Sequence, residues 1–197
     1  MNYLAHLALS PHNDDIMCGN YLADSIRPSQ RVGWSEDMIA GYDLHLRIDR
    51  YTDAHPGFIN AKKKLRTYHK KYAPVVLDIL NDHLLSIHWE SYYGILFEDW
   101  AVEVYQRLQP FLIDTLPPNA HKLLSGLLHH KYLHVYRSQQ GIVEVLERMD
   151  RRTKFESDFA SGADHLYQDL AFFESCFHDL YRDLCITFDP SHDILTP

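Results

Sequence analysis

The amino-acid sequence predicts an all-α protein, a multi-helix bundle. Apolar residues recur at spacings of three and four along almost the whole chain, the period of an amphipathic helix. The chain has only eight glycines, and few runs alternate β-branched and polar residues as strands do. Its 197 residues suffice for one sizeable core and are few for two. With no repeat and no linker found, we predict one domain over 1–187 and a loose C-terminal tail over 188–197.

Helix-breaking and helix-capping residues place the element boundaries. Ser10-Pro11 ends the first helix, and Asn13 caps the second, whose first turn carries Asp14 and Asp15. Later boundaries fall at prolines: Pro28, Pro56, Pro74, Pro117 and Pro118. We therefore predict helices over 2–9, 14–26, 35–54, 57–68, 73–92, 94–113, 118–138, 140–150 and 160–187.

Composition and charge exclude several classes of protein. The chain is 46% hydrophobic and 23% charged, as ordinary globular proteins are. Its net charge of −8 argues against general nucleic-acid binding, which depends on neutralising phosphates. No apolar run approaches the ~20 residues that span a bilayer, and the N-terminus lacks the marks of a signal peptide. Three cysteines without a CxxC pattern fit a reducing compartment. We expect a cytoplasmic protein that binds neither nucleic acid nor membrane.

The segment "GYDLHLRIDRYTDAH", residues 41–55, places ionisable groups on a helix that its apolar residues suggest is buried. On a helical wheel one sector of about 100° holds both kinds of residue: Met38, Ile39, Tyr42, His45, Leu46, Asp49 and Asp53. A second apolar patch on another side holds Leu44, Ile48 and Tyr51, so we expect the helix to be covered on both of these sides. His45 and Asp49 lie one turn apart. Because burial of an unpaired carboxylate is very unfavourable, these groups either pair with Arg47 or Arg50 or surround a cation.

Three further helices carry His or Asp in an apolar setting. His6 lies in "YLAHLAL", and Asp24 ends "GNYLAD", where Arg27 or a metal would offset its charge. The helix "VLDILNDHLLSIHW" contains Asp78, Asp82, His83 and His88. Oxygen and imidazole ligands without a thiolate suit Mn²⁺, Mg²⁺, Fe²⁺ or a catalytic Zn²⁺.

Competing patterns are weaker. His130 and His134 have ligand spacing but no carboxylate nearby in sequence, and Asp164-His165 lies at a polar helix start. Cys18 lies in an apolar helix without an activating base. The sequence contains no nucleophile elbow, P-loop, HExxH motif or Rossmann glycine fingerprint.

Five segments together resemble the bacterial acyl carrier protein phosphodiesterase family: "MNYLAHLALS", "GNYLAD", "HLRIDRYTDAHP", "VLDILNDHLLSIHW" and "ERMDRRTKF". The resemblance is collinear from residue 1 to about 180. It implies a metal-dependent hydrolase that removes the 4′-phosphopantetheine arm from holo-acyl carrier protein, using Mn²⁺ or alternatively Mg²⁺ or Fe²⁺. It also implies an HD-domain-like fold, although the His-Asp order of HD enzymes is reversed here in Asp82-His83.

Carried over by position, the resemblance implies a set of metal ligands: His6, Asp24, His45, Asp49, Asp82 and His83. Among these we assign catalytic roles to Asp24, Asp49 and His83, because hydrolysis of a phosphodiester needs an activated water and a group that moves a proton. A site that has kept the ligands but changed its substrate would act on a nucleotide or another small phosphoester. A degenerate site would leave a helical binding protein.

The strongest positive charge lies in one short segment. Residues 62–71 contain six of the chain's 19 Lys and Arg: Lys62, Lys63, Lys64, Arg66, Lys70 and Lys71. Either this segment is a solvated helix face, or it docks an acidic partner. Acyl carrier protein, the partner that the resemblance implies, is strongly acidic. A second candidate patch is Arg151, Arg152 and Lys154.

Overall fold

The described residues of the computed structural model, 3–153 and 157–189, form α-helices joined by loops and short 3-10 turns and contain no β-strand, which confirms the all-α prediction. The helices are α1 (Tyr3–Ala8), α2 (Asp14–Leu22), α3 (Glu36–Ala54), α4 (Pro56–His69), α5 (Ala73–Ile87), α6 (Trp89–Tyr93), α7 (Phe97–Leu108), α8 (Pro118–His130), α9 (Gln139–Asp150), α10 (Ser161–Gln168) and α11 (Leu170–Phe188). The 3-10 turns are η1 (Ala23–Ser25), η2 (Pro28–Gln30), η3 (Lys70–Tyr72), η4 (Gln109–Phe111) and η5 (Tyr132–Arg137). In this part of the chain no helix combines the length and apolar character needed to cross a membrane.

Several predicted helices are shorter than the sequence suggested. Those predicted over 14–26, 73–92, 118–138 and 160–187 are interrupted after Leu22, at His88, at Lys131 and at Asp169. Lys131 ends α8 in the left-handed region, at φ 49°, although neither Gly nor Pro marks the place. A break that keeps the apolar spacing is invisible to periodicity. Phe188, placed in the tail by the prediction, still belongs to α11, and residues 190–197 lie outside the described part.

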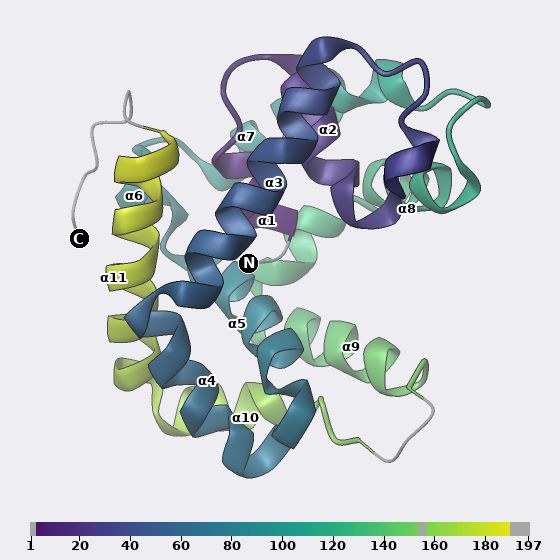
Figure 1. Ribbon diagram of the computed structural model, residues 1–197. Coiled ribbons are helices and arrows are strands. Elements are labelled where there is room, and N and C mark those ends of the chain that lie inside the picture. The colour runs from purple at the N-terminus through teal and green to yellow at the C-terminus, as the bar shows by residue number, and fades with distance from the viewer. Residues whose placement is uncertain (1–2, 154–156, 190–197) are drawn as a thin grey trace.

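Helix α5 lies at the centre of the molecule (Figure 1). It contacts α1, α4, α9, α10 and α11, and every residue from Ile79 to Ser86 is buried. Helices α2, α3, α7 and α8 pack toward one end of the molecule, and α4 and α10 toward the other (Figure 1). The short helix α1 packs against both α2 and α5, and so brings the N-terminal segment into the core.

Two glycines let α2 and α3 touch backbone to backbone. A Cβ on Gly19 would lie 2.0 Å from the carbonyl oxygen of Met38, and one on Gly41 would lie 2.1 Å from that of Ile16. Any larger residue at either position would push the helices apart. This close approach lets a backbone carbonyl of α2 reach a side chain of α3, as described below.

The buried face of α3 differs from the predicted sector. It consists of Met38, Gly41, His45, Ile48 and Thr52, whereas Ile39 and Leu46 are 37% and 43% exposed. The prediction that Ile39 and Leu46 face the core was therefore wrong. The prediction took the large apolar residues as the buried ones, whereas α3 packs on α2 through the face that carries the small Gly41. The predicted burial of His45 is confirmed.

Candidate metal centre

Two histidines and two aspartates from α1, η1 and α3 meet in one place. The Oδ1 atom of Asp49 lies 3.1 Å from His6 Nε2, and its Oδ2 atom lies 3.1 Å from His45 Nε2. His45 Nε2 is also 3.1 Å from Oδ1 of Asp24. The two imidazole rings stack with centroids 3.9 Å apart. We call His6, Asp24, His45 and Asp49 the His/Asp cluster.

Asn20 on α2 orients both rings. Its side-chain Nδ2 donates to the backbone oxygen of His6 and to Ser10 Oγ, which leaves Oδ1 as an acceptor. His6 Nδ1 donates to that Oδ1 at 3.0 Å, and His45 Nδ1 donates to the backbone oxygen of Asn20 at 2.9 Å. Both rings therefore turn Nε2 toward the carboxylates. Metal-binding histidines are commonly fixed in this way, by an acceptor on the other ring nitrogen.

The pKa values of the cluster reflect one shared positive charge. Burial lowers the pKa of His6. Burial also opposes a charge on His45, but its hydrogen bonds to Asp24 and Asp49 outweigh burial and raise its pKa to about 9. The same bonds hold the pKa values of Asp24 and Asp49 below the usual range, although burial alone would raise that of Asp49. The cluster thus has ionised carboxylates, a charged His45 and a neutral His6.

This charge balance leaves one contact unsatisfied, and a divalent cation would satisfy it. A neutral His6 whose proton is on Nδ1 turns the lone pair of Nε2 toward an anionic oxygen of Asp49 at 3.1 Å, which is repulsive. A second proton on His6 would instead stack two positive rings. Imidazole nitrogens and carboxylate oxygens are ligands for Mn²⁺ and Fe²⁺, and the oxygens also for Mg²⁺. The residues therefore fit a divalent metal.

The structure does not bring the other two predicted ligands, Asp82 and His83, into this cluster. Among the described residues, the histidine, cysteine and acidic side chains whose ligand atoms all lie within 4.8 Å of one another are His6, His45 and Asp49. Asp24 adjoins these three through its contact with His45 Nε2, whereas Asp82 and His83 contact none of them through a hydrogen bond or ion pair in the described part of the chain. Asp82 is fully buried and accepts hydrogen bonds from the backbone N–H groups of Leu4 and Ala5. The sequence could show that α5 buries a carboxylate, but not that the start of α1 meets it.

His83 has a structural hydrogen-bond partner at each ring nitrogen. Its Nδ1 donates to the backbone oxygen of Tyr136 at 2.6 Å, and its Nε2 accepts from Tyr167 Oη at 2.7 Å. Burial lowers its pKa, so the ring is neutral near pH 7. In this state neither nitrogen has a lone pair free for a metal or for a proton in transit.

The weaker sequence patterns lie outside the cluster. His165 Nδ1 lies 3.2 Å from Nε2 of His69, and neither ring is among the described groups whose ligand atoms converge with those of His6 and His45. Cys18 is buried, and burial raises the pKa of its thiol, so it is not a nucleophile. His130 lines a large groove described next.

Two hollows adjoin the cluster. The smaller, of about 230 Å³, is lined by Asp24, Asp49, Asp53, Phe58, Pro74 and Asp78. The larger is a groove of about 1060 Å³ whose lining residues come from α1, α2, η1, α5, α8, η5 and α9 and from Arg152. Asp24 and Asp78 line both hollows. The side chains of Asp24 and Asp49 are 68% and 39% exposed, so the carboxylate side of the cluster is open to solvent.

Sequence reasoning missed Asn20 and did not assign Asp78. Asn20 is fully buried in an apolar helix, which signals a required hydrogen bond but not its partners. Asp78 precedes Asp82 by four residues on α5, so both lie on one side of that helix. Burial raises the pKa of Asp78.

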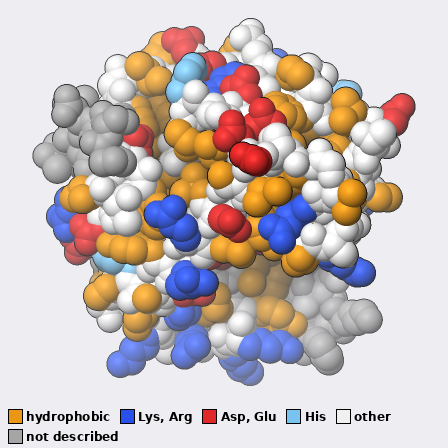
Figure 2. All heavy atoms as spheres, turned by 45° about the horizontal axis from the view of Figure 1, so that its top comes forward, with side chains coloured by type: hydrophobic (Ala, Val, Ile, Leu, Met, Phe, Trp, Pro, Cys, Tyr) orange, Lys and Arg blue, Asp and Glu red, His pale blue; other side chains and the backbone are white. Residues whose placement is uncertain are grey.

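The predicted basic segment is only partly available to a partner. Lys64 pairs with Asp169 at 2.8 Å, and its ammonium lies over the ring of Phe172. Lys63, Arg66, Lys70 and Lys71 are exposed. Figure 2 shows Lys and Arg side chains along the lower edge of the molecule, and Asp and Glu side chains in the middle of the view. Of the second patch, Arg151 lies 3.7 Å from Glu147 and Lys154 lies outside the described residues.

Comparison with known proteins identifies the family. A sequence model described as "Acyl carrier protein phosphodiesterase" matches residues 1–184. The chain is 31% identical over 186 residues to the acyl carrier protein phosphodiesterase of Photorhabdus laumondii, an alignment that covers 92% of this chain and 91% of the relative. It is 32% identical over 157 residues to the enzyme of Escherichia coli K12, covering 77% and 79% of the two chains. No solved structure matches significantly, so the likeness to HD-domain enzymes stays a prediction. The chain belongs to the acyl carrier protein phosphodiesterase family.

Proposed function

We propose that this protein hydrolyses the phosphodiester between 4′-phosphopantetheine and the serine of holo-acyl carrier protein, releasing the apo form, with a divalent cation held by His6, Asp24, His45 and Asp49. The names of the relatives support the substrate. The observation that carries the chemistry is the convergence of two imidazole Nε2 atoms on the carboxylate of Asp49. Imidazole and carboxylate ligands suit Mn²⁺, Mg²⁺ or Fe²⁺, and the resemblance to the family favours Mn²⁺ among them.

The bound cation supplies a Lewis acid for the phosphoryl oxygens and lowers the pKa of a water molecule toward neutrality. The protein supplies a rigid set of ligands. His6 and His45 are each 2% exposed, and Asn20 fixes their tautomers and ring planes. Such preorganisation lowers the reorganisation that the site must undergo as charge develops on the phosphate.

We assign the proton that the leaving serine oxygen needs to Asp78. A carboxyl that keeps its proton to a higher pH than usual is suited to general-acid catalysis. Burial raises the pKa of Asp78, and its side chain faces both hollows beside the cluster. His83, for which the sequence suggested a catalytic role, has both ring nitrogens engaged.

Docking of the carrier protein by the basic segment at 62–71 stays part of the proposal. Its exposed members Lys63, Arg66, Lys70 and Lys71 form a cationic edge on a protein of net charge −8, which favours an acidic partner by electrostatic complementarity. We also propose a cytoplasmic location, because the three cysteines are free thiols.

Mass spectrometry of holo-acyl carrier protein tests the proposal. Purified protein with added Mn²⁺ should convert the holo form to the apo form and release 4′-phosphopantetheine. The same protein with excess chelator, and the Asp49→Ala variant with Mn²⁺, should leave the holo form intact. An unchanged holo form in the presence of Mn²⁺-loaded wild-type protein would rule the activity out. Failure to bind Mn²⁺ at all would indicate a binding protein with a degenerate site.

A further inference from the structure

The large groove beside the His/Asp cluster has the size of a binding site for an organic ligand. Its volume of about 1060 Å³ lies just above the roughly 300–1,000 Å³ typical of such sites. The smaller hollow, at about 230 Å³, lies below that range. Asp24 and Asp78 line both, so a ligand in the groove would have one end at the reacting centre.

The lining of the groove suits a linear chain of amides and methylenes. The apolar side chains that line it include Val75, Ile79 and Val145, and the hydroxyl-bearing side chains of Tyr3 and Tyr132 also line it. Burial raises the pKa of Tyr3, so its phenol stays protonated and can donate to an amide oxygen. A purely apolar groove would leave the amide groups of the ligand without hydrogen-bond partners, which is unfavourable.

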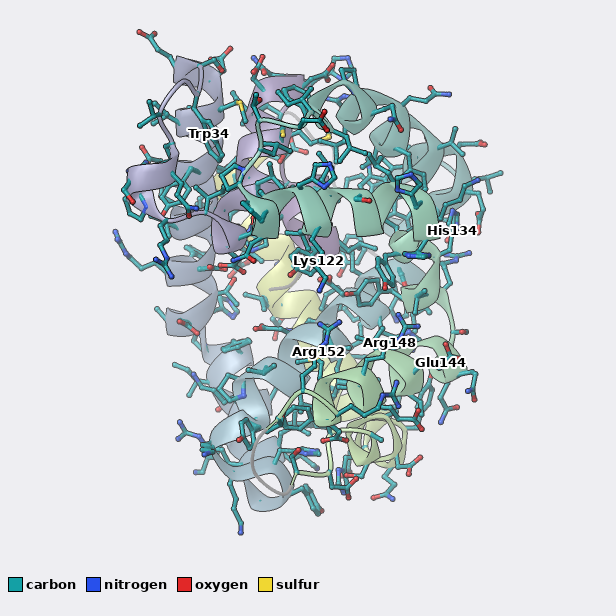
Figure 3. The ribbon with its side chains drawn as sticks, turned by 90° about the vertical axis from the view of Figure 1, so that its right-hand side faces the viewer. Trp34, Lys122, His134, Glu144, Arg148 and Arg152 are labelled. Atoms are coloured by element: carbon teal, nitrogen blue, oxygen red, sulfur yellow. The ribbon has the colours of Figure 1, made fainter. Side chains whose placement is uncertain are left out.

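Three cations face this groove. Lys122 on α8 and Arg148 and Arg152 from the α9 side point into the space between these two helices (Figure 3). Arg148 pairs with Glu144 and donates to Tyr132 Oη. Within the described part of the chain, neither Lys122 nor Arg152 forms an ion pair. Asp24 raises and Arg152 lowers the pKa of Tyr3, and all three residues line the groove.

We propose that this groove binds the extended 4′-phosphopantetheine arm, with its phosphate at the end lined by Asp24 and Asp78 and its amides along α8 and α9. Lys122 and Arg152 offset the repulsion between the anionic phosphodiester and the acidic end of the groove. The inference rests on the proposed function for the identity of the ligand. It adds the site at which the enzyme distinguishes its own substrate from other phosphodiesters.

A groove-filling substitution and a matched control test this assignment. Val145→Trp on α9 should fill part of the groove, whereas Val102→Trp makes the same change on α7, at a site that is 47% exposed and outside the groove. We expect Val145→Trp to slow holo-carrier conversion at least ~10-fold and to weaken calorimetric binding of free 4′-phosphopantetheine similarly, since small misplacements of a substrate cost that much or more. Hydrolysis of bis(4-nitrophenyl) phosphate should change less than about 2-fold.

A charge-reversal pair covers the case in which Val145→Trp does not fold. Lys122→Glu and Arg152→Glu alter exposed side chains and should weaken binding of free 4′-phosphopantetheine at least ~10-fold. Lys131→Glu, just beyond the end of α8 and outside the groove, should leave it unchanged. Unchanged binding in the groove variants, or an equal loss for both phosphodiesters, would overturn the groove as the arm site.

The two proposals fail separately. A wild-type protein that cannot convert holo-carrier protein refutes the proposed function, and calorimetry with free 4′-phosphopantetheine then still decides the groove. If Val145→Trp converts the carrier as fast as the wild-type protein does, the groove is not the site of the arm, and the proposed function still stands.

Discussion

The molecule buries histidine next to aspartate in two places, and the two places differ in what the side chains face. In the His/Asp cluster, Nε2 of His6 and Nε2 of His45 both face the carboxylate of Asp49. On α5, the neighbours Asp82 and His83 instead face backbone groups and a tyrosine hydroxyl. The histidines are buried in both places, so burial of the histidine does not separate them.

What separates the two places is the balance of protons and lone pairs. The cluster needs more positive charge than its own protons supply without stacking two imidazolium rings. On α5, both oxygens of Asp82 accept from backbone N–H groups and both ring nitrogens of His83 have a partner of opposite kind, so no lone pair of this pair faces another ligand atom. A buried His or Asp thus indicates a metal only where its free lone pair faces another ligand atom, and the predictions below test this rule.

The largest expected difference is in turnover. Asp49→Ala removes the carboxylate shared by both histidines, and we expect holo-carrier conversion to fall about 1,000-fold or more, since a catalytic metal contributes several kcal/mol. His83→Gln should stay within about 10-fold of wild type. Conversion rates measured by mass spectrometry at saturating Mn²⁺ check both. Equal losses in the two variants would place His83 in the reaction after all.

The second difference concerns pH and stability. Burial raises the pKa of Asp82 to about 7, against the hydrogen bond from Leu4, whereas an unfolded aspartate titrates near 3.9. Between about pH 4 and 7, Asp82 therefore holds a proton in the folded state and has released it in the unfolded state. Stability from Asp82 is full below about pH 4 and is lost as pH rises through about 7, with a slope of at most ~1.4 kcal/mol per pH unit.

Urea denaturation of wild type and Asp82→Asn across pH 4.5–8, without metal, isolates this contribution. Other titrating groups are common to both proteins and cancel in the difference. The stability of wild type relative to the variant should fall as pH rises. A difference that grows with pH would mean that Asp82 is ionised in the folded protein.

The third difference is the response of the fold to metal. A ligand at 100 times its dissociation constant adds about 2.7 kcal/mol to stability, which for a chain of this size raises the melting temperature by roughly 5–10 °C. Chelator-treated wild type should show this rise on addition of Mn²⁺, and His83→Gln should show it equally. Asp49→Ala should not respond. A response of Asp49→Ala equal to that of wild type would show that the metal binds elsewhere.

Much of the cluster was predictable from the sequence. His6, Asp24, His45 and Asp49 each stand out as polar groups on an apolar helix, and the resemblance selected all four. The all-α class followed from the spacing of apolar residues alone. Both predictions rest on local information, that is, on a residue and its near neighbours in the sequence.

The rest depended on contacts between distant segments. Asp82 meets Leu4, 78 positions away, and His83 meets the backbone of Tyr136, 53 positions away. A backbone group has no sequence signature as a hydrogen-bond partner, so these two contacts could not be predicted. Asn20 was overlooked because the sequence does not show which ring its side-chain oxygen meets, and because it orients His45 through a backbone oxygen, which any residue possesses.

The smallest expected effect comes from a variant that changes the orientation of the His6 ring without removing a metal ligand. Asn20→Ala removes the Oδ1 that accepts from His6 Nδ1 but keeps the backbone oxygen that holds His45. Freed from that bond, His6 can rotate or shift its proton to Nε2, the atom that faces Asp49. Loss of such an orienting partner typically costs 10–100-fold in metal affinity, which calorimetric titration of Mn²⁺ should detect. Ser10→Ala is the matched control, because it removes a bond of Asn20 Nδ2 and leaves both rings held. Unchanged affinity in Asn20→Ala would mean that ring stacking alone fixes His6, and a loss as large in Ser10→Ala would assign the effect to the packing of α1 on α2.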